Sequence, residues 1–168
     1  MVEPLRRERL RLEPLTVDHA AAMVAVLADA ALYSFTGGSP PTLEELTRRY
    51  SRQSVGHSPD GSEQWLNWVV VLRDDSRPVG YVQATVVGDE AEVAWVVSPS
   101  EQGRGLAGEA ASAMVEWLAS AGIDRLVAHI HPDHAASARV AARLGLRRTD
   151  VVEDGEERWV LDLSRIES

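Results

Sequence analysis

The sequence predicts an α+β fold built on a mixed, mainly antiparallel sheet. Three runs rich in Val and Trp follow one another across tight turns between residues 65 and 97, which is typical of an antiparallel meander. A helical segment at 106–121 and a strand at 126–130 come next. This strand–helix–strand order requires the two strands to be parallel if they pair. A hairpin near the end of the chain completes the predicted sheet.

The first third of the chain contains one strand and two helices. Residues 9–13 alternate apolar and charged side chains, which predicts a short strand. Thr16 is the expected N-cap of a helix that runs through Leu27. Residues 42–45 have the capping-box pattern, and apolar residues at helical spacing follow them. The second of the two helices therefore begins at residue 43.

The rest of the chain supplies six more strands and two helices. The meander strands are expected at 65–72, 79–87 and 91–97. Gly122 and Gly145 stand where glycine commonly ends a helix, and they close the helices predicted at 106–121 and 137–144. Two final strands, at 146–152 and 157–163, turn at Asp154 and Gly155.

Composition limits the classes of function. A chain of 168 residues is expected to form a single domain over 1–168, long enough to bury a full core. It has no cysteine and no lysine, which removes thiol nucleophiles, disulfides, Schiff-base chemistry and a P-loop lysine. The net charge of −9 disfavours binding to nucleic acid. With no signal-peptide pattern and no bilayer-length apolar run, we expect a cytoplasmic protein that does not bind membranes.

A glycine-rich loop lies between the third meander strand and the following helix. Gly103, Gly105 and Gly108 let backbone N–H groups approach a phosphate at a helix N-terminus. The three glycines also match the G-x-G-x-x-G pattern of dinucleotide sites. However, five residues that include Pro99 separate them from their strand, and an antiparallel meander precedes it. The remaining alternative is a turn that binds nothing.

At this loop the chain resembles the GNAT superfamily of acetyl-CoA-dependent N-acetyltransferases. Gln102, Gly105 and Ala107 match the family's Q/R-x-x-G-x-G/A pattern. Residues 134–146 resemble the N-x-x-S-x-x-V-x-x-x-L-G-F element of its ribosomal-protein branch, and the order of elements agrees from about residue 9 to 162. The resemblance implies a sheet of six to seven strands, flanked by about four helices, in which the parallel fourth and fifth strands splay apart.

In this family the pantetheine arm of acetyl-CoA enters between the splayed strands. The resemblance implies that backbone groups of 96–97 pair with the arm, and that N–H groups of the glycine loop hold the pyrophosphate. The expected cofactor-binding residues are Val96, Val97, Gln102, Gly103, Arg104, Gly105, Leu106, Ala107, His134 and Ser137. The Val97 N–H is also the expected donor to the oxyanion.

The reaction transfers an acyl group from a thioester to an amine, so it needs a proton acceptor. Glu92 is the leading candidate because it lies on the strand that resembles the family's catalytic strand, at a position that is often acidic. The alternative is that Glu90 and Glu92 form a solvated strand face near a turn. His131, at the end of the following strand, is the alternative base or proton relay.

The proton donor departs from the family's pattern. Ala141 occupies the position where many members carry a catalytic tyrosine. Ser137 matches the serine that lies near the thioester sulfur, and it is expected to donate a hydrogen bond to the leaving thiolate. Its alternative role is helix capping. His134 replaces the asparagine that contacts the cofactor arm, and it can still donate and accept hydrogen bonds.

The histidines also permit a different hypothesis, a histidine-based metalloenzyme. His129, His131 and His134 could in principle supply an open zinc site, but no acidic ligand is fixed by spacing, so we expect no metal. A third hypothesis is a non-catalytic acyl-CoA-binding module, since the usual tyrosine and asparagine are absent. An acetyl-enzyme is not expected in a chain without cysteine.

The acceptor is a primary amine that the sequence does not identify. A protein N-terminus, an amino acid, a polyamine and an aminoglycoside all stay open, and the negative net charge slightly favours a cationic acceptor. Tyr33, Asn67 and Tyr81 are polar candidates near the acceptor site, as is one of Trp65 and Trp68, which should face opposite sides of a strand. A monomer and a homodimer are equally compatible with the sequence.

Overall fold

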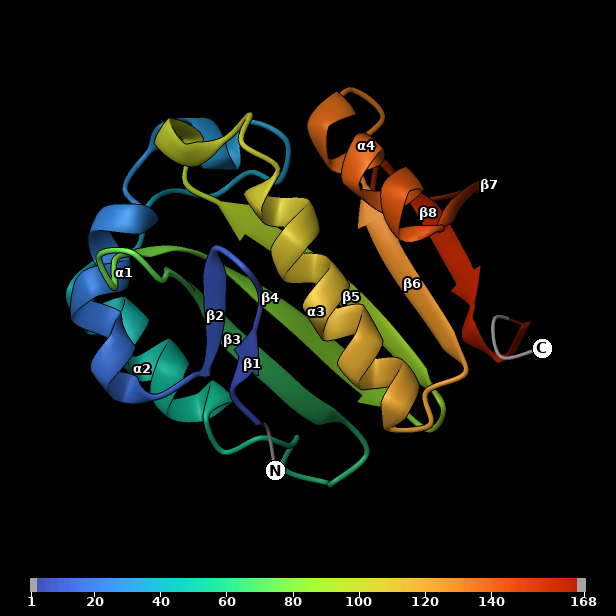
Figure 1. The fold of residues 1–168 in the computed structure, drawn as a ribbon, viewed down its shortest axis with the longest axis horizontal. Helices are drawn as coiled ribbons and strands as arrows, with labels where there is room; N and C mark the ends of the chain where they lie inside the picture. The colour runs from blue at the N-terminus through green and yellow to red at the C-terminus, as the bar shows by residue number, and fades with distance from the viewer. Residues whose placement is uncertain (1–2, 166–168) are drawn as a thin grey trace.

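A computed structural model describes residues 3–165 and shows an α+β fold (Figure 1). The strands are β1 (Leu5–Arg6), β2 (Leu10–Pro14), β3 (Gln64–Leu72), β4 (Pro78–Val87), β5 (Glu90–Val97), β6 (Arg125–Ile130), β7 (Arg147–Glu153) and β8 (Glu156–Asp162). The helices are α1 (Ala20–Val26), α2 (Leu43–Gln53), α3 (Leu106–Ser120) and α4 (Ala135–Leu144). Short 3₁₀ turns are η1 (Val17–His19), η2 (Ala30–Tyr33), η3 (Pro99–Glu101) and η4 (Leu163–Arg165).

The predicted fold class is confirmed. One eight-stranded sheet has the order β1-β2-β3-β4-β5-β6-β8-β7, and its strands pair antiparallel except for β5 with β6. Seven of the strands are the predicted ones, and β1 adds the eighth. Two residues are too few to show the alternation that predicts a strand, so β1 has no signal in the sequence.

The parallel pair is joined only at its beginning. Residues 90–92 of β5 pair with 125–127 of β6, and the pairing stops at Glu92 and Val127. Both strands then continue, to Val97 and to Ile130, without pairing with each other. The expected splay is therefore present, and it leaves a wedge that opens toward the carboxyl ends of β5 and β6 (Figure 1).

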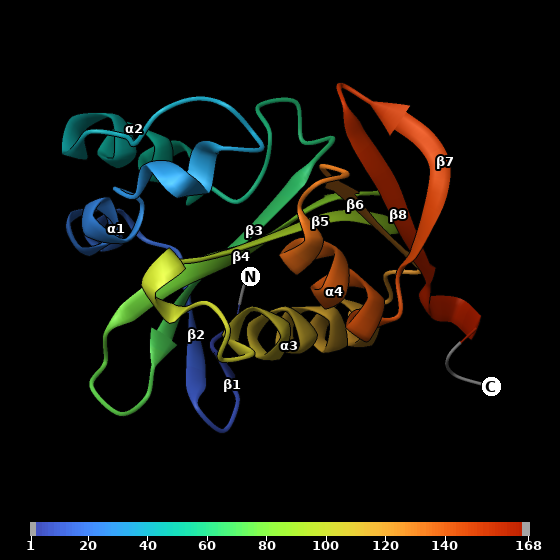
Figure 2. The ribbon, with the colours of Figure 1, turned by 90° about the horizontal axis from the view of Figure 1, so that it is seen from above.

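Helices cover both faces of the sheet, as Figure 2 shows, with α1 and α2 on one side and α3 and α4 on the other. The strands alternate accordingly. Trp68, Val82 and Val93 belong to the core beneath α3, whereas Val69 and Val71 pack with α1 and α2. In β4 and β6 the odd-numbered residues face α1 and α2, and in β5 the even-numbered residues do. The side chains of Tyr81, Glu92 and His129 therefore lie on the same side of the sheet.

The helices differ from the predictions mainly at their beginnings. Thr16 precedes η1, so α1 starts only at Ala20. The α2 cap is as predicted, because the Glu45 N–H donates to Oγ1 of Thr42 over 3.1 Å. The last helix starts two residues before the predicted Ser137. Within residues 3–165, no helix has the length and apolarity needed to cross a membrane.

Candidate active site

The open edge of β5 presents backbone groups to the wedge. The Ser98 N–H donates to the Val79 carbonyl over 2.7 Å, which directs it toward β4. Backbone groups alternate between the two edges of a strand, so the N–H and C=O of Val97 point to the opposite, open edge. The side-chain amide of Gln102 reaches that carbonyl at 3.0 Å, which agrees with this direction.

Gly80 brings the backbone of β4 unusually close to β5. An added Cβ at Gly80 would lie 2.0 Å from the Val96 carbonyl oxygen and 2.9 Å from the Val97 Cα. The carbonyl of Val96 therefore points at β4, not into the wedge. Of the two residues expected to pair with the cofactor arm, Val97 presents its backbone groups to the open edge, and Val96 presents its side chain to the face of α1 and α2.

The glycine loop leads into α3 with the backbone that only glycine adopts readily. Gly103 has φ of 84°, and Gly105, the N-cap of α3, has φ of 77°. The first helical bond to this cap comes from Glu109, so the N–H groups of 106–108 have no intrahelical acceptor. Apart from the adjacent residues and the backbone of the helix itself, no atom lies within 4 Å of a Cβ added at Gly103 or Gly108. The loop thus has free donors, a helix dipole and open space, which fit a pyrophosphate.

Arg104 is held at this loop by an ion-pair network. Its guanidinium lies 2.5 Å from Glu101, whose other oxygen contacts Arg77 at the same distance. The Glu101 side chain is almost fully buried, and the hydrogen bond from Arg77 holds its pKa below the usual range. Arg9 donates to the Arg104 carbonyl over 2.8 Å and pairs with Glu109 in α3. Three arginines therefore lie around the loop that sequence reasoning singled out.

Glu92 occupies the closed end of the wedge. Its Oε1 lies 3.1 Å from Nδ1 of His129, and Nε2 of that imidazole lies 3.4 Å from Oε2 of Glu153. The Glu92 side chain is 60% exposed and that of His129 only 20%. The predicted base is therefore an accessible carboxylate with a histidine partner, and the contact to Glu153 in β7 had no signal in the sequence.

His131, His134 and Ser137 come together at the open end of β6. The Ser137 hydroxyl lies 3.3 Å from Nε2 of His134, the N-cap residue of α4. The Phe35 ring stacks on His134 at 4.6 Å between ring centroids and contacts His131 at 5.2 Å. Burial, and then the proximity of His131, lower the pKa of His134. Both effects favour the neutral imidazole.

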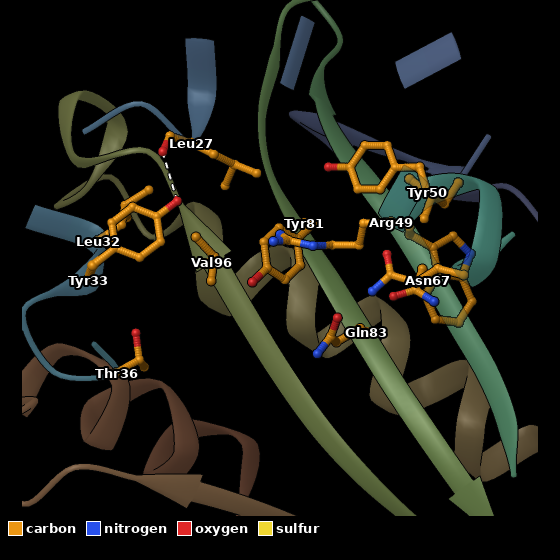
Figure 3. Close-up of a pocket in the computed structure, with 13 residues that line it drawn as sticks. Leu27, Leu32, Tyr33, Thr36, Arg49, Tyr50, Asn67, Tyr81, Gln83 and Val96 are labelled. Carbon is orange, nitrogen blue, oxygen red and sulfur yellow. Dashed lines mark hydrogen bonds between the residues drawn. The ribbon is translucent and has the colours of Figure 1, made fainter. Parts of the chain in front are cut away.

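A cavity of about 160 Å³ lies on the α1 and α2 side of the sheet (Figure 3). Val96 of β5 lines one part of it, and Leu15, Leu27 and Leu32 line another. Its polar groups come from α2, β3, β4 and the segment after α1, and they are Tyr33, Thr36, Arg49, Tyr50, Gln53, Asn67, Tyr81 and Gln83. Burial raises the pKa of Tyr81, and that of Tyr50 to about 12, so both phenols stay protonated.

A second hollow adjoins the cavity through Gln53, Asn67 and Gln83. Trp65 lines this hollow, while Trp68 packs against Trp117 beneath α3, so the two tryptophans do face opposite sides. Thr85 also lines it, and Glu92 is the register partner of Thr85 on the same face. The hollow therefore extends from the cavity toward the closed end of the wedge.

The sequence predicted part of this cavity. It proposed Tyr33, Asn67 and Tyr81 but not Arg49. The signal was available, because residues 46, 49, 50 and 53 repeat at helical spacing and must share one face of α2. Phe35 follows a short 3₁₀ turn and had no comparable pattern.

The three histidines lie in two separate places. His129 lies between two glutamates, whereas His131 and His134 lie against Phe35. Across residues 3–165, no group of three or more His, Asp or Glu side chains is placed to hold a metal ion. The metalloenzyme hypothesis therefore lacks a ligand set in the described part of the chain.

A splayed parallel pair beside a glycine turn at a helix N-terminus is the arrangement expected of an acetyltransferase. Comparison with protein families agrees, because the model described as an acetyltransferase (GNAT) domain matches residues 9–147. The chain belongs to the GNAT acetyltransferase family, as the loop motif predicted.

Known proteins support the assignment. The chain is 31% identical over 97 residues to the uncharacterized N-acetyltransferase YnaD of Bacillus subtilis, a match that covers 54% of this chain and 57% of the relative. The chain thus spans just over half of that relative's length. A GNAT-family acetyltransferase from Bacillus anthracis has the same fold, with 20% identity, coverage of 96% and 99% of the two chains, and a TM-score of 0.79.

The fold is also that of a solved ribosomal L7/L12 α-N-protein acetyltransferase, RimL, in complex with coenzyme A. The two sequences are 18% identical, and the TM-score is 0.80. The match covers 95% of this chain and 98% of the RimL chain. At this identity the likeness establishes the shared fold and leaves the acceptor open.

Proposed function

We propose that the chain transfers an acetyl group from acetyl-CoA to a primary amine, which attacks the thioester directly. The observation that carries this proposal is the wedge, where β5 and β6 part after Glu92 and Val127 while β5 keeps an unpaired edge to Val97. An extended arm can add to such an edge through backbone hydrogen bonds. Acetyl-CoA supplies an activated acyl group whose sulfur leaves readily.

The proposed binding residues form two groups. The N–H groups of 103–107 and the Arg104 guanidinium hold the pyrophosphate, supported by the open loop and the ion pair with Glu101. The Gln102 N–H, which the sequence also suggested, already donates to the Pro99 carbonyl over 3.3 Å. The Val97 N–H faces the wedge and is the donor to the thioester end of the arm. The backbone of Val96 is directed at β4, so Val96 contributes only its side chain beside the site. His134 and Ser137 line its other side at the start of α4.

Glu92 accepts the proton of the attacking amine in this proposal, directly or through a water molecule. Its carboxylate is exposed at the closed end of the wedge, and His129 orients it over 3.1 Å. His131 is the alternative relay, but its Nδ1 already accepts the Asp133 N–H over 3.1 Å at the open end. The geometry therefore favours Glu92.

The Val97 N–H donates to the developing oxyanion, and the Ser137 hydroxyl donates to the departing sulfur. Ser137 contacts His134, but within the described chain no carboxylate contacts that imidazole. A nucleophilic serine needs a base that a third group orients. The missing third group and the absence of cysteine support direct attack over an acetyl-enzyme.

We further propose that residues 1–168 act as a single acetyltransferase domain, because one continuous sheet spans the described chain. The cytoplasm is the proposed location, which rests on the sequence and not on the sheet. The test is release of coenzyme A from acetyl-CoA across a panel of amines. The chain contains no cysteine, so a thiol reagent detects coenzyme A without a protein background. Amine-dependent release supports the proposal. Saturable acetyl-CoA binding without release for any amine would favour the non-catalytic binding module.

A further inference from the structure

The cavity of about 160 Å³ on the α1 and α2 side of the sheet has a charge opposite to that of the whole protein. The chain carries a net charge of −9, yet Arg49 is the one charged side chain that lines the cavity in the described structure. The adjoining hollow adds Arg52, and no carboxylate lines either space. Net charge favours a cationic acceptor approaching the surface, whereas the lining favours an anionic group inside.

Arg49 is available to bind such a group. Its neighbour Arg48 pairs with Glu44 at 2.9 Å on the surface of α2. Arg49 has no ion pair with any residue of the described range, and its side chain extends over the cavity toward Tyr81 (Figure 3). An arginine kept free of carboxylates beside a cavity is suited to a planar anion, because the guanidinium forms paired hydrogen bonds with a carboxylate.

The groups around Arg49 complete a carboxylate-binding environment. Tyr50 and Tyr81 stay protonated and can donate hydrogen bonds, and the side-chain amides of Asn67 and Gln83 can donate as well. The Tyr33 hydroxyl is already committed to the Leu27 carbonyl, at 2.8 Å (Figure 3). The cavity therefore offers several donors and a fixed positive charge, but no anion that would hold an ammonium group.

The cavity also fixes the size and direction of the acceptor. Val96 lines it from β5, beside the open edge where the thioester would lie, and Arg49 lines it from α2. A volume of about 160 Å³ suits a small molecule, since a cavity of roughly 150 Å³ accommodates benzene. An acceptor whose anion contacts Arg49 can thus direct its amine toward β5. The same positive charge lowers the pKa of a nearby ammonium group, which favours the neutral amine that attacks.

Resting on the acetyltransferase function proposed above, we propose that the acceptor is a small amine that carries a carboxylate, of the free amino acid class, and that Arg49 binds the carboxylate. This selects one class from those that the sequence leaves open. It disfavours polyamines and aminoglycosides, whose additional positive charges would face Arg49 and Arg52 without a carboxylate.

The test compares matched acceptors, for example alanine and alaninamide, in the wild type and in Arg49→Gln. The wild type should prefer the acid, and Arg49→Gln should reduce kcat/KM for the acid by roughly 10- to 100-fold, mainly through KM, while the amide changes little. Rates are compared per neutral amine, which removes the difference in basicity between the two acceptors from the wild-type preference. That difference also cancels when the variants are compared. Arg49→Lys should recover part of the loss because it keeps the charge but not the paired donors.

Arg48→Gln is the matched control, since it removes a neighbouring arginine of α2 that faces away from the cavity. It should leave the preference unchanged. Equal loss for the acid and the amide in Arg49→Gln would overturn the role of Arg49, and a wild-type preference for alaninamide, a polyamine or a peptide N-terminus would overturn the acceptor class. If no amine releases coenzyme A, the proposed acetyltransferase function itself fails. This result differs from a failure of the acceptor class, in which some other amine still releases coenzyme A.

Discussion

The Oε1 atom of Glu92 lies 3.1 Å from Nδ1 of His129, at the point where β5 and β6 stop pairing. This contact places a carboxylate and an imidazole across the closed end of the wedge, on the face that also carries the cavity. A strand register that ended one residue later would put Val93, which points to the α3 core, at the same place. The register of β5 therefore determines that Glu92 and its partner His129 occupy the closed end of the wedge.

Glu92→Gln should lower kcat by about 100-fold or more, because the amide keeps the shape of the side chain but cannot accept a proton. Acetyl-CoA binding should persist. The matched control is Glu153→Gln, which removes the more distant carboxylate from the other nitrogen of His129. That exposed pair should affect the rate by less than about fivefold. Full activity of Glu92→Gln in steady-state kinetics would remove Glu92 from the mechanism.

Ser137→Ala should reduce kcat by about 3- to 10-fold, the range expected for losing one neutral hydrogen bond to the leaving group. Ser112→Ala is the control, since the Ser112 hydroxyl donates to the Glu109 carbonyl within α3 over 2.8 Å. Both variants should unfold at similar denaturant concentrations. If Ser137→Ala loses stability but keeps its turnover, then the hydroxyl serves the start of α4 and not the reaction.

Two glycine substitutions should change stability in opposite directions. Gly80→Ala should lower the free energy of unfolding by about 2–3 kcal/mol, because the new methyl would overlap the Val96 carbonyl. Gly108→Ala should raise it by about 0.5 kcal/mol, because Gly108 lies in the first turn of α3 with no atom within 4 Å of an added Cβ. Urea denaturation of both variants measures the contrast, and equal effects would contradict the close approach of β4 and β5.

The ion pairs of Glu101 should make stability depend on pH. Hydrogen bonding from Arg77, with a further contribution from Arg104, lowers the pKa of Glu101 from its ordinary 4.5. A carboxyl with a lowered native pKa stabilises the fold above its unfolded pKa, and this contribution disappears as the pH falls through the native pKa. Glu101→Gln should therefore be less stable at pH 7 and should lose less stability on acidification below about pH 4.5. The free energy of unfolding of both proteins is measured from pH 7 down to acidic pH. An equal loss of stability in the two proteins would contradict this role of Glu101.

Much of the fold was predictable because local patterns and global topology agree. The Thr42 capping box, the meander turns and the Asp154–Gly155 hairpin each reflect local chemistry that the structure repeats. The start of α1 was not predictable in the same way. Thr16 fits an N-cap, but a 3₁₀ turn over Val17–His19 follows it before the α-helix begins. Propensity at a helix end cannot distinguish these two kinds of turn.

The candidate site was predictable only where its residues lie in one segment. The glycine loop and residues 134–137 are local motifs and were found. Contacts between distant segments, such as His129 with Glu153 or Phe35 with His134, depend on how the sheet and loops bring them together. Arg49 is an intermediate case. Helical spacing predicts which face of α2 carries Arg49, but it does not predict that this face lines a cavity.

Titration calorimetry with acetyl-CoA, beside NADH, tests the central claim most directly. We expect saturable binding of acetyl-CoA at one site and no binding of NADH, because the proposed site combines the open edge of β5 for the pantetheine arm with the donors of the α3 N-terminus for the pyrophosphate. Binding of NADH alone, or no binding at millimolar acetyl-CoA, would contradict it. The glycine loop would then be a dinucleotide site in the first case and a turn without a ligand in the second.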